Sequence, residues 1–203
     1  MTAMRNFDGS AADFTRINQL DELMCQELHE EGKPKLTAYG MGWFEAHCAP
    51  DRKSYRDWCT LTLEIKGVAR GFCVFSRQTM AAPSAGRKRK RREAFMELFW
   101  ISIESDLRGS GNGSRLLERS IEVARERWPE IVAVRLHVRS PSPLVLALPA
   151  SVHGSDVISW TAMPQVMSNN AAVRFYKRLG FEITALKKDY PKGYEAYRMV
   201  KAL

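Results

Sequence analysis

A glycine-rich segment between an apolar strand and an amphipathic helix constrains the fold of this 203-residue chain more than any other feature. Phe95–Glu104 is strongly apolar, residues 108–113 read Arg-Gly-Ser-Gly-Asn-Gly, and a helical pattern begins near Ser114. Ile131–Arg139 then alternates apolar and polar residues, as a half-buried strand does. A strand, a helix and a strand joined in this way favour a right-handed βαβ unit. The helix carries its apolar stripe at Leu117, Ile121, Ala124 and Trp128.

The glycine-rich segment has the composition of a phosphate-binding loop. Gly111 and Gly113 let the backbone turn tightly and let its amide hydrogens approach an anion, and the start of the following helix adds unpaired N–H donors. Arg108 adds a fixed positive charge at the entrance. A tight turn that holds no ligand is the alternative. The segment is not a Walker loop, since no Lys-Ser/Thr pair follows, and it lacks the G-x-G-x-x-G spacing of dinucleotide sites.

A second amphipathic helix is predicted over Asn169–Leu179. Its expected buried face contains Ala172, Phe175, Tyr176 and Leu179, and Gly180 has the place of a C-terminal helix glycine. Two strands are predicted to follow it, over Phe181–Leu186 and Tyr194–Val200.

The N-terminal half predicts a helix and a strand hairpin. Apolar residues recur at helical spacing over Ala11–Glu31, and the aromatic-rich stretch Tyr39–Trp58 is typical of a shorter helix and a loop. A short edge strand is expected at Met4–Phe7. The hairpin is predicted from strand Thr60–Ile65, turn Lys66-Gly67 and strand Val68–Ser76.

Two segments lack the pattern of a packed core. Residues 79–93 combine small and polar residues with the consecutive basic run Arg87–Arg92, and we expect a surface loop. This run accounts for six of the eight net positive charges, so it could be a nuclear localisation signal, a contact with an anionic partner such as nucleic acid, or a solvated loop. Residues 141–167 hold four prolines between apolar patches, and we interpret them as an insertion that could dock a partner subunit.

Composition argues against several classes of protein. No apolar run reaches the ~20 residues that span a bilayer, so we expect no membrane association. Residues 1–10 lack the pattern of a secretory signal, which favours a cytoplasmic location, with the nucleus as the alternative that the basic run raises. The four cysteines form no Cys-x-x-Cys pair, so we expect buried free thiols and no metal site. They are Cys25, Cys48, Cys59 and Cys73.

Two motifs in this order resemble the GNAT superfamily of acetyltransferases. Arg108-x-x-Gly111-x-Gly113 after an apolar strand is similar to its acetyl-CoA motif. Asn169-x-x-Ala172-x-x-Phe175-Tyr176-x-x-x-Gly180-Phe181 is similar to its second motif. The resemblance implies an α+β fold over a single domain, residues 1–203, with a mixed, mostly antiparallel sheet that is splayed at the cofactor site and flanked by helices. It also implies acetyl-CoA as the cofactor.

Finer likenesses point to more than one branch of the superfamily. Leu136-His137-Val138 and Phe175–Ile183 resemble NatE-type enzymes that acetylate N-terminal amines, and Asp189–Met199 is similar to the tyrosine-bearing substrate loop of NatA-type and ribosomal-protein enzymes. Met96–Trp100 instead resembles histone acetyltransferases, which carry a catalytic glutamate there. The resemblance therefore predicts an N-acetyltransferase and leaves its acceptor open.

The resemblance also implies which residues contact the cofactor. The backbone of the motif strand is expected to grip the pantetheine arm, the glycine loop the pyrophosphate, and the second motif the arm near the sulfur. These residues are Ile101, Ser102, Ile103, Arg108, Gly109, Ser110, Gly111, Asn112, Gly113, Ser114, Asn169 and Tyr176.

Direct attack of an amine on a thioester needs a base and an acid. Glu97 is the first candidate base, because a carboxylate on an apolar strand face is expected to have a raised pKa; a buried ion pair is the alternative. In a regular strand it would share that face with Phe95, Phe99 and Ile101, although a β-bulge could change the face. His137 is the second candidate base or else a solvent-facing histidine, and Tyr176 is the candidate acid or else a core aromatic.

The acceptor is the least determined part of the prediction. Tyr190, Tyr194 and Tyr197 are candidate walls of the acceptor site, or ordinary strand aromatics. The main hypothesis is transfer of acetyl to a primary amine of a protein or peptide, either an N-terminal amine or a lysine. The alternatives are a small-amine or polyamine acetyltransferase, and a basic nucleic-acid- or chromatin-binding module with a degenerate acetyl-CoA site.

Overall fold

The computed structural model describes residues 2–27, 40–81, 92–139, 171–187 and 195–203. The insertion at 141–167, Asn169, Tyr190, Tyr194 and the basic residues 87–91 lie outside this part of the chain. Contacts divide the chain into unit 1, which is Met1–Val134 with Leu203, and unit 2, which is Arg135–Ala202. The single domain over residues 1–203 stays a prediction.

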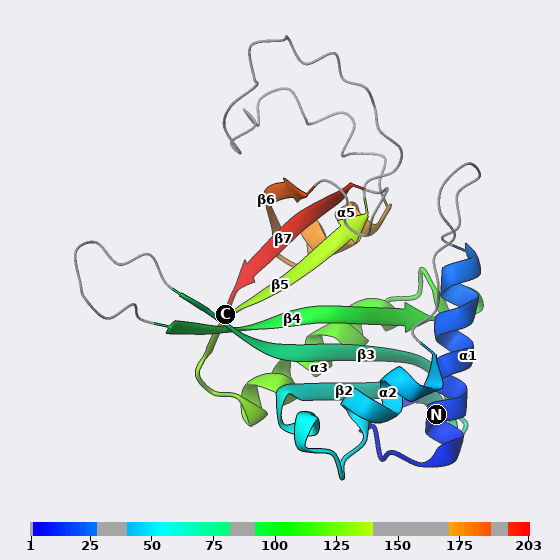
Figure 1. Cartoon of the computed structure of the whole chain (residues 1–203). Helices are drawn as coiled ribbons and strands as arrows, with labels where there is room; N and C mark the ends of the chain where they lie inside the picture. The colour runs from blue at the N-terminus through cyan, green and yellow to red at the C-terminus, as the bar shows by residue number, and fades with distance from the viewer. Residues whose placement is uncertain (1, 28–39, 82–91, 140–170, 188–194) are drawn as a thin grey trace, which may run out of the picture. The chain divides into compact units, whose positions relative to one another are not determined.

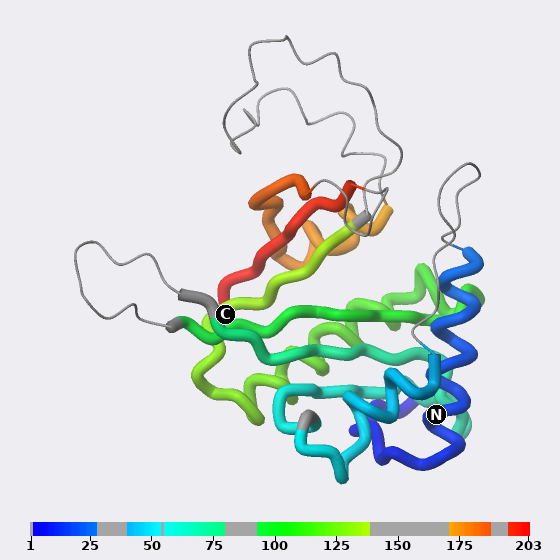
Figure 2. Tube along the Cα trace, in the orientation of Figure 1, coloured from blue at the N-terminus to red at the C-terminus, as the bar shows by residue number. Residues whose placement is uncertain are grey.

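Unit 1 is a four-stranded antiparallel sheet with helices on both faces (Figure 1). Its strands pair in chain order: β1 (Thr2–Asn6), β2 (Trp58–Ile65), β3 (Val68–Ala81) and β4 (Arg92–Ile103). Its helices are α1 (Ala11–Glu27), α2 (Met41–Cys48) and α3 (Asn112–Arg127), with 3-10 turns η1 (Lys53–Asp57) and η2 (Ser105–Leu107). The Cα trace in Figure 2 shows α1 and α2 on one face of this sheet and α3 on the other.

The predicted hairpin is confirmed, but its strands are longer than expected. Lys66 and Gly67 both have positive φ, 54° and 76°, as a tight two-residue hairpin turn requires. Strand β3 continues to Ala81 and β4 begins at Arg92, so the prediction of a loop over residues 79–93 is wrong at both ends. The reason is cross-strand pairing, such as Ala81 with Arg92, which lets small and polar residues continue a ladder.

The core between the sheet and helices α1 and α2 is mainly aromatic and aliphatic. Phe44 of α2 lies edge-on to Phe72 of β3 with ring centroids 5.8 Å apart, and both side chains are fully buried. Burying rings of this size supplies much of the free energy that holds helices on a sheet. The cluster contains Phe7, Phe14, Ile17, Leu20, Phe44, Cys48, Ala49, Phe72 and Val74.

Helix α3 covers the other face, as its sequence pattern predicts. The predicted stripe is buried, together with Leu116, which the pattern did not include. Trp128 follows the helix, and its indole Nε1 donates a 3.0 Å hydrogen bond to the carbonyl of Arg56. This bond ties the end of α3 to η1.

A β-bulge interrupts β4 in front of the glycine loop. Val74 of β3 pairs with Trp100 and the next residue, Phe75, pairs with Leu98, so Phe99 is the extra residue. Phe99 and Trp100 consequently both pack on the α1/α2 core, which consecutive residues of a regular strand cannot do. Because of this bulge, Ile101 does not share the face of Glu97, as a regular strand would require.

Unit 2 contains strands and one described helix. Strand β5 (Ile131–Arg139) begins in unit 1, and α5 (Ala171–Arg178), β6 (Glu182–Lys187) and β7 (Ala196–Ala202) follow, with the strands in the order β5-β7-β6. Strands β6 and β7 are antiparallel. The α+β class predicted from the sequence is confirmed. The predicted splay of the sheet concerns the placement of the two units and stays a prediction.

Helix α5 ends in a glycine cap. Phe181 N–H donates to the carbonyl of Tyr176 and Gly180 N–H to that of Lys177, and Gly180 has a φ of +83°, which together form a Schellman motif. The predicted buried face holds for Tyr176, which is buried, and for Phe175 and Leu179, which are half-buried. Ala172 is exposed, and Val173 is buried instead.

The four cysteines are buried and free, as predicted. Burial raises the pKa of the Cys25, Cys48 and Cys59 thiols to about 11, and raises that of Cys73 further. At pH 8 a thiol with this pKa is about one-thousandth thiolate, and the thiolate is the reactive form. We therefore expect all four thiols to react at least about 100-fold more slowly with a disulfide reagent in the native protein than in denaturant. Rapid native labelling of any one would contradict this burial.

Among the residues that the structure describes, no helix is long and apolar enough to cross a membrane. No group of three or more potential metal ligands occurs in the same ranges.

Candidate functional site

The glycine loop lies between η2 and α3 and presents a row of backbone donors. Gly109 and Gly111 have positive φ, +79° and +83°, and no atom lies within 4 Å of the position that a Cβ would take on either. The N–H groups of residues 109–114 donate no hydrogen bond to any acceptor in the described part of the chain. A loop with open glycines and a helix N-terminus beside it has the donor set of an anion site.

The polar side chains of the loop hold its shape. Asn112 is buried, and its amide nitrogen donates to the carbonyl of Leu107 at 3.2 Å and to Ser110 Oγ at 2.8 Å. Ser110 Oγ donates to the same carbonyl, and Arg115 donates to Asn112 Oδ1. Ser110 and Asn112 were predicted to contact the cofactor. Their side chains are used within the loop, and their backbone N–H groups remain for a ligand.

Arg108 is oriented by two partners at the loop entrance. Its Nε donates a 2.8 Å hydrogen bond to the carbonyl of Ile103, and its Nη2 lies 2.6 Å from Glu27 Oε2 of α1. The side chain is 46% exposed, so the guanidinium can still face an anion in solvent. The role of Arg108 as a positive charge for a bound anion stays a prediction.

Glu104 anchors the end of β4 and was not predicted from the sequence. Its carboxylate pairs with Arg16 of α1 and Arg70 of β3, and Arg70 also pairs with Asp106 Oδ2 at 2.7 Å. The backbone N–H of Glu104 donates to the carbonyl of Arg70. These bonds join α1, β3 and η2 at the residue that precedes η2, which in turn precedes the glycine loop. Charge-assisted hydrogen bonds are stronger than neutral ones, so this network holds the start of η2 in place.

The residues that are predicted to bind the pantetheine arm form the last part of β4. Ile101, Ser102 and Ile103 pair with Cys73, Phe72 and Gly71 of β3. Ser102 is buried, and its hydroxyl donates to the carbonyl of Leu20 in α1 at 3.4 Å. The Ser102 side chain is therefore a contact to α1, and the predicted contact of Ser102 with the cofactor would use its backbone groups.

Glu97 lies on the α2-covered face of unit 1. It pairs across the sheet with Ser76, which in turn pairs with Trp58, so the three residues form a row across β4, β3 and β2. Trp58 packs on the α1/α2 core, and side chains in such a row share one face of the sheet. Glu97 is half-buried on this face.

An aromatic cluster stands on the same face beside Glu97. We define it as Trp43 and His47 of α2, Trp58 of β2 and Phe99 of β4. The Trp43 ring is stacked between His47, at 4.6 Å, and Phe99, at 4.9 Å, and Trp58 lies edge-on to Phe99 at 5.2 Å. Each of the four side chains is partly exposed. The sequence showed only a signal of aromatic richness over residues 39–58 and no indication that Phe99 would join it.

Unit 2 holds the other predicted catalytic side chains. His137 lies on the half-buried side of β5, between buried Leu136 and Val138, as the alternation predicted. Tyr176 is 9% exposed on α5, with its ring 5.0 Å from Phe175 and 5.6 Å from Phe181. Tyr197, a predicted acceptor wall, is buried on β7. The roles of these three residues stay predictions.

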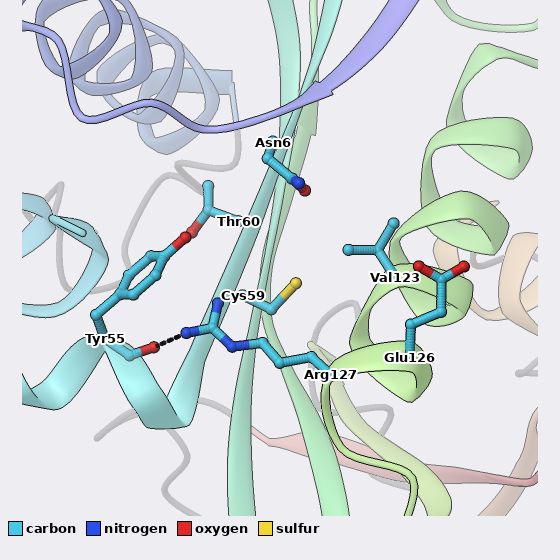
Figure 3. Close-up of a pocket in the computed structure, with 7 residues that line it drawn as sticks. All are labelled: Asn6, Tyr55, Cys59, Thr60, Val123, Glu126 and Arg127. Atoms are coloured by element: carbon cyan, nitrogen blue, oxygen red, sulfur yellow. Dashed lines mark hydrogen bonds between the residues drawn. The ribbon is translucent and has the colours of Figure 1, made fainter.

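A separate cavity of about 310 Å³ lies at the edge of the unit 1 sheet, where β1 ends (Figure 3). Arg127 of α3 is one of its lining residues. The Arg127 guanidinium lies 4.2 Å from the centroid of the Tyr55 ring and donates a 2.6 Å hydrogen bond to the Tyr55 carbonyl. No residue that the sequence assigned to the cofactor or to catalysis lines it. The lining residues are Asn6, Tyr55, Cys59, Thr60, Val123, Glu126 and Arg127.

Comparison with protein families identifies one match. The profile of the acetyltransferase (GNAT) family matches residues 21–149, which is more than half of the chain. No curated protein matches the sequence at a significant level.

Solved structures with a similar fold span almost the whole chain. The ribosomal-protein-S18-alanine N-acetyltransferase from Escherichia coli is 16% identical, with a TM-score of 0.59 and coverage of 100% of this chain and 94% of that one. NAA60 from Arabidopsis thaliana in complex with acetyl-CoA is 13% identical, with a TM-score of 0.61 and coverage of 100% and 99%. An aminoglycoside 6′-N-acetyltransferase complexed with coenzyme A is 15% identical, with a TM-score of 0.61 and coverage of 98% and 96%. At these identities the likeness shows the fold alone.

Proposed function

Because this chain belongs to the GNAT family of acetyltransferases, for which acetyl-CoA is the acetyl donor, we propose that it acetylates a primary amine of a protein or peptide. The observation that carries the proposal is the glycine loop, with two open positive-φ glycines and six backbone N–H groups that have no acceptor in the described residues. The predicted alternative of a binding module with a degenerate cofactor site would not need this loop to be intact.

The residues of the loop fit the phosphate groups of acetyl-CoA. The N–H groups of residues 109–114 would hold the pyrophosphate, since open glycines let an anion approach the backbone. Arg108 would add charge at the entrance. When bound, acetyl-CoA supplies an acetyl group on a thioester, which an amine can take up directly.

We assign the proton transfers to three side chains. Glu97 accepts a proton from the acceptor ammonium at its carboxylate, because it is half-buried on the face that carries the aromatic cluster. His137 is the alternative base, at the matching place of the NatE-type enzymes that its strand resembles. Tyr176 is the acid: its phenol carries the hydroxyl proton that the leaving group needs.

A thermal shift measurement tests the cofactor. A ligand that binds only the folded protein adds about 2.7 kcal/mol at 100 times its Kd. For a chain of this length we expect acetyl-CoA to raise the Tm by about 5–10 °C, and free CoA to raise it as well. Absence of any rise at millimolar acetyl-CoA would contradict the assignment of the loop.

The acceptor is tested separately, by release of free CoA in the presence of amines. We expect turnover with peptides that offer an N-terminal amine or a lysine, each carrying one free amine and compared with the same peptide acetylated in advance. The polyamine alternative expects several carboxylates around the acceptor, and Glu97 is the only acidic residue of the row across β2, β3 and β4. If spermidine were acetylated and none of the peptides were, a polyamine would replace the protein or peptide amine as the proposed acceptor.

A further inference from the structure

We propose that the aromatic cluster beside Glu97 selects acceptors in which the side chain nearest the amine is large and apolar. This inference rests on the proposed function and deepens it, because it names the chemistry of the acceptor. It concerns only Glu97, Trp43, His47, Trp58 and Phe99, all of which belong to unit 1.

The bulge of β4 places the cluster and the carboxylate together. Phe99 is the extra residue at the bulge, and both it and Glu97 lie on the face that α2 covers. Residues two apart in a strand are separated by about 7 Å. An ammonium group held at Glu97 would therefore have its own first side chain, and not a distant part of the acceptor, within reach of the Phe99 ring.

The rings are held in place by one another. Trp43 is stacked between His47 and Phe99, with interplanar angles of 17° and 9°, and His47 Nδ1 donates a 2.8 Å hydrogen bond to the Trp43 carbonyl. Trp58 meets Trp43, His47 and Phe99 edge-on at 5.1–5.2 Å. A rigid set of partly exposed rings loses little conformational entropy when it contacts a ligand, which is typical of recognition surfaces.

The Glu97 carboxylate limits which acceptors fit beside the aromatic cluster. The four residues of the cluster carry no carboxylate, and Glu97 lies two residues before Phe99 on the same face of the sheet. An acceptor with an ammonium followed by an apolar side chain matches this arrangement at both points. An acidic side chain next to the amine would lie close to the Glu97 carboxylate, and two like charges repel each other.

The experiment compares acceptor peptides with the unmodified protein. Four peptides differ only in their first residue, which is Phe, Met, Ser or Asp, and each has one free α-amine. We expect kcat/KM for the Phe and Met peptides to exceed that for the Ser peptide by about tenfold, and that for the Asp peptide by more, as a hydrophobic contact allows. Equal kcat/KM for all four would overturn the inference.

Two substitutions assign the preference to the cluster. We expect Phe99→Ala to reduce the Phe-over-Ser preference to less than about threefold, with the KM for acetyl-CoA unchanged, and Phe99→Leu to retain part of it. Phe95→Ala is the matched control, because Phe95 lies two residues before Glu97 on the same strand, is buried, and is outside the cluster. If Phe95→Ala removed the preference and Phe99→Ala did not, the cluster would not be its source.

The outcomes separate this inference from the proposed function. Turnover of all four peptides without preference would overturn the inference and leave the proposed function standing. Turnover of spermidine alone, in the same assay, would overturn the proposed function itself. The comparison among peptides uses the unmodified protein, so it decides the inference even if Phe99→Ala fails to fold.

Discussion

Replacing Gly111 by alanine is expected to weaken acetyl-CoA binding by about 20-fold or more, equivalent to about 1.8 kcal/mol. Gly111 adopts a φ of +83° at the N-cap of α3, in the middle of the six N–H groups that we assign to the pyrophosphate. In the protein without ligand, the added Cβ would meet nothing within 4 Å. The open space at that position is the space that an anion needs to reach the amides, so a methyl group there would obstruct the ligand. Isothermal titration with acetyl-CoA measures the effect.

The chain offers a matched control for this substitution in the hairpin turn. Gly67 has a φ of +76°, and a Cβ on it would also meet nothing within 4 Å. Gly67→Ala should therefore cost a similar, small amount of folding free energy, about 1 kcal/mol, because alanine is strained in the left-handed region. We expect it to leave the Kd for acetyl-CoA within twofold of the unmodified protein. Equal losses of affinity in the two variants would mean that backbone strain and not obstruction weakens binding.

Periodicity predicted the elements that fix the site, because local patterning decides them. The amphipathic stripe of α3 and the alternation of β5 both led to the observed elements, and the positive φ values at Lys66 and Gly67 are what the predicted turn requires. The glycine loop could be predicted as a tight and accessible turn, because glycines adopt positive φ and let other groups approach the backbone closely. The roles of the loop and of Arg108 toward the cofactor stay predictions.

The features that the sequence did not disclose depend on contacts between distant segments. The bulge at Phe99 exists through register with β3, and it brings Phe99 onto Trp43, 56 residues away in the chain by their numbers. Glu104 reads as the last residue of an apolar strand, whereas its role comes from Arg16 and Arg70. The sequence also did not predict that β3 extends to Ala81 and that β4 begins at Arg92. These strand ends form because the two strands pair with each other, and not because their residues have a high strand propensity.

Glu97→Gln is expected to lower kcat by at least about tenfold, and by as much as 100-fold or more if proton removal limits turnover. The amide keeps the shape of the side chain and cannot take up a proton, so acetyl-CoA binding, measured by thermal shift, should be unchanged. Glu97 belongs to β4 and the alternative base His137 to β5, so each single variant removes one candidate base and keeps the other.

The pH dependence of the rate distinguishes the two candidates. The ascending limb of kcat/KM reports the group that must lose its proton, and only the variant that lacks this group should lose that limb. We expect Glu97→Gln to flatten it and His137→Gln to retain it. The reverse result would make His137 the base and would leave Glu97 as the carboxylate that holds the acceptor ammonium.

Tyr176→Phe tests the other half of the proton transfer. The substitution removes one oxygen atom and keeps the ring against Phe175 and Phe181, so the packing of α5 in unit 2 is retained. We expect kcat to fall at least about tenfold at pH values where the phenol is protonated in the unmodified protein, because the leaving thiolate then loses its proton donor. Rates like those of the unmodified protein in both Tyr176→Phe and Glu97→Gln would show that these side chains are structural. The glycine loop would then bind acetyl-CoA for a transfer whose proton carriers are water or His137.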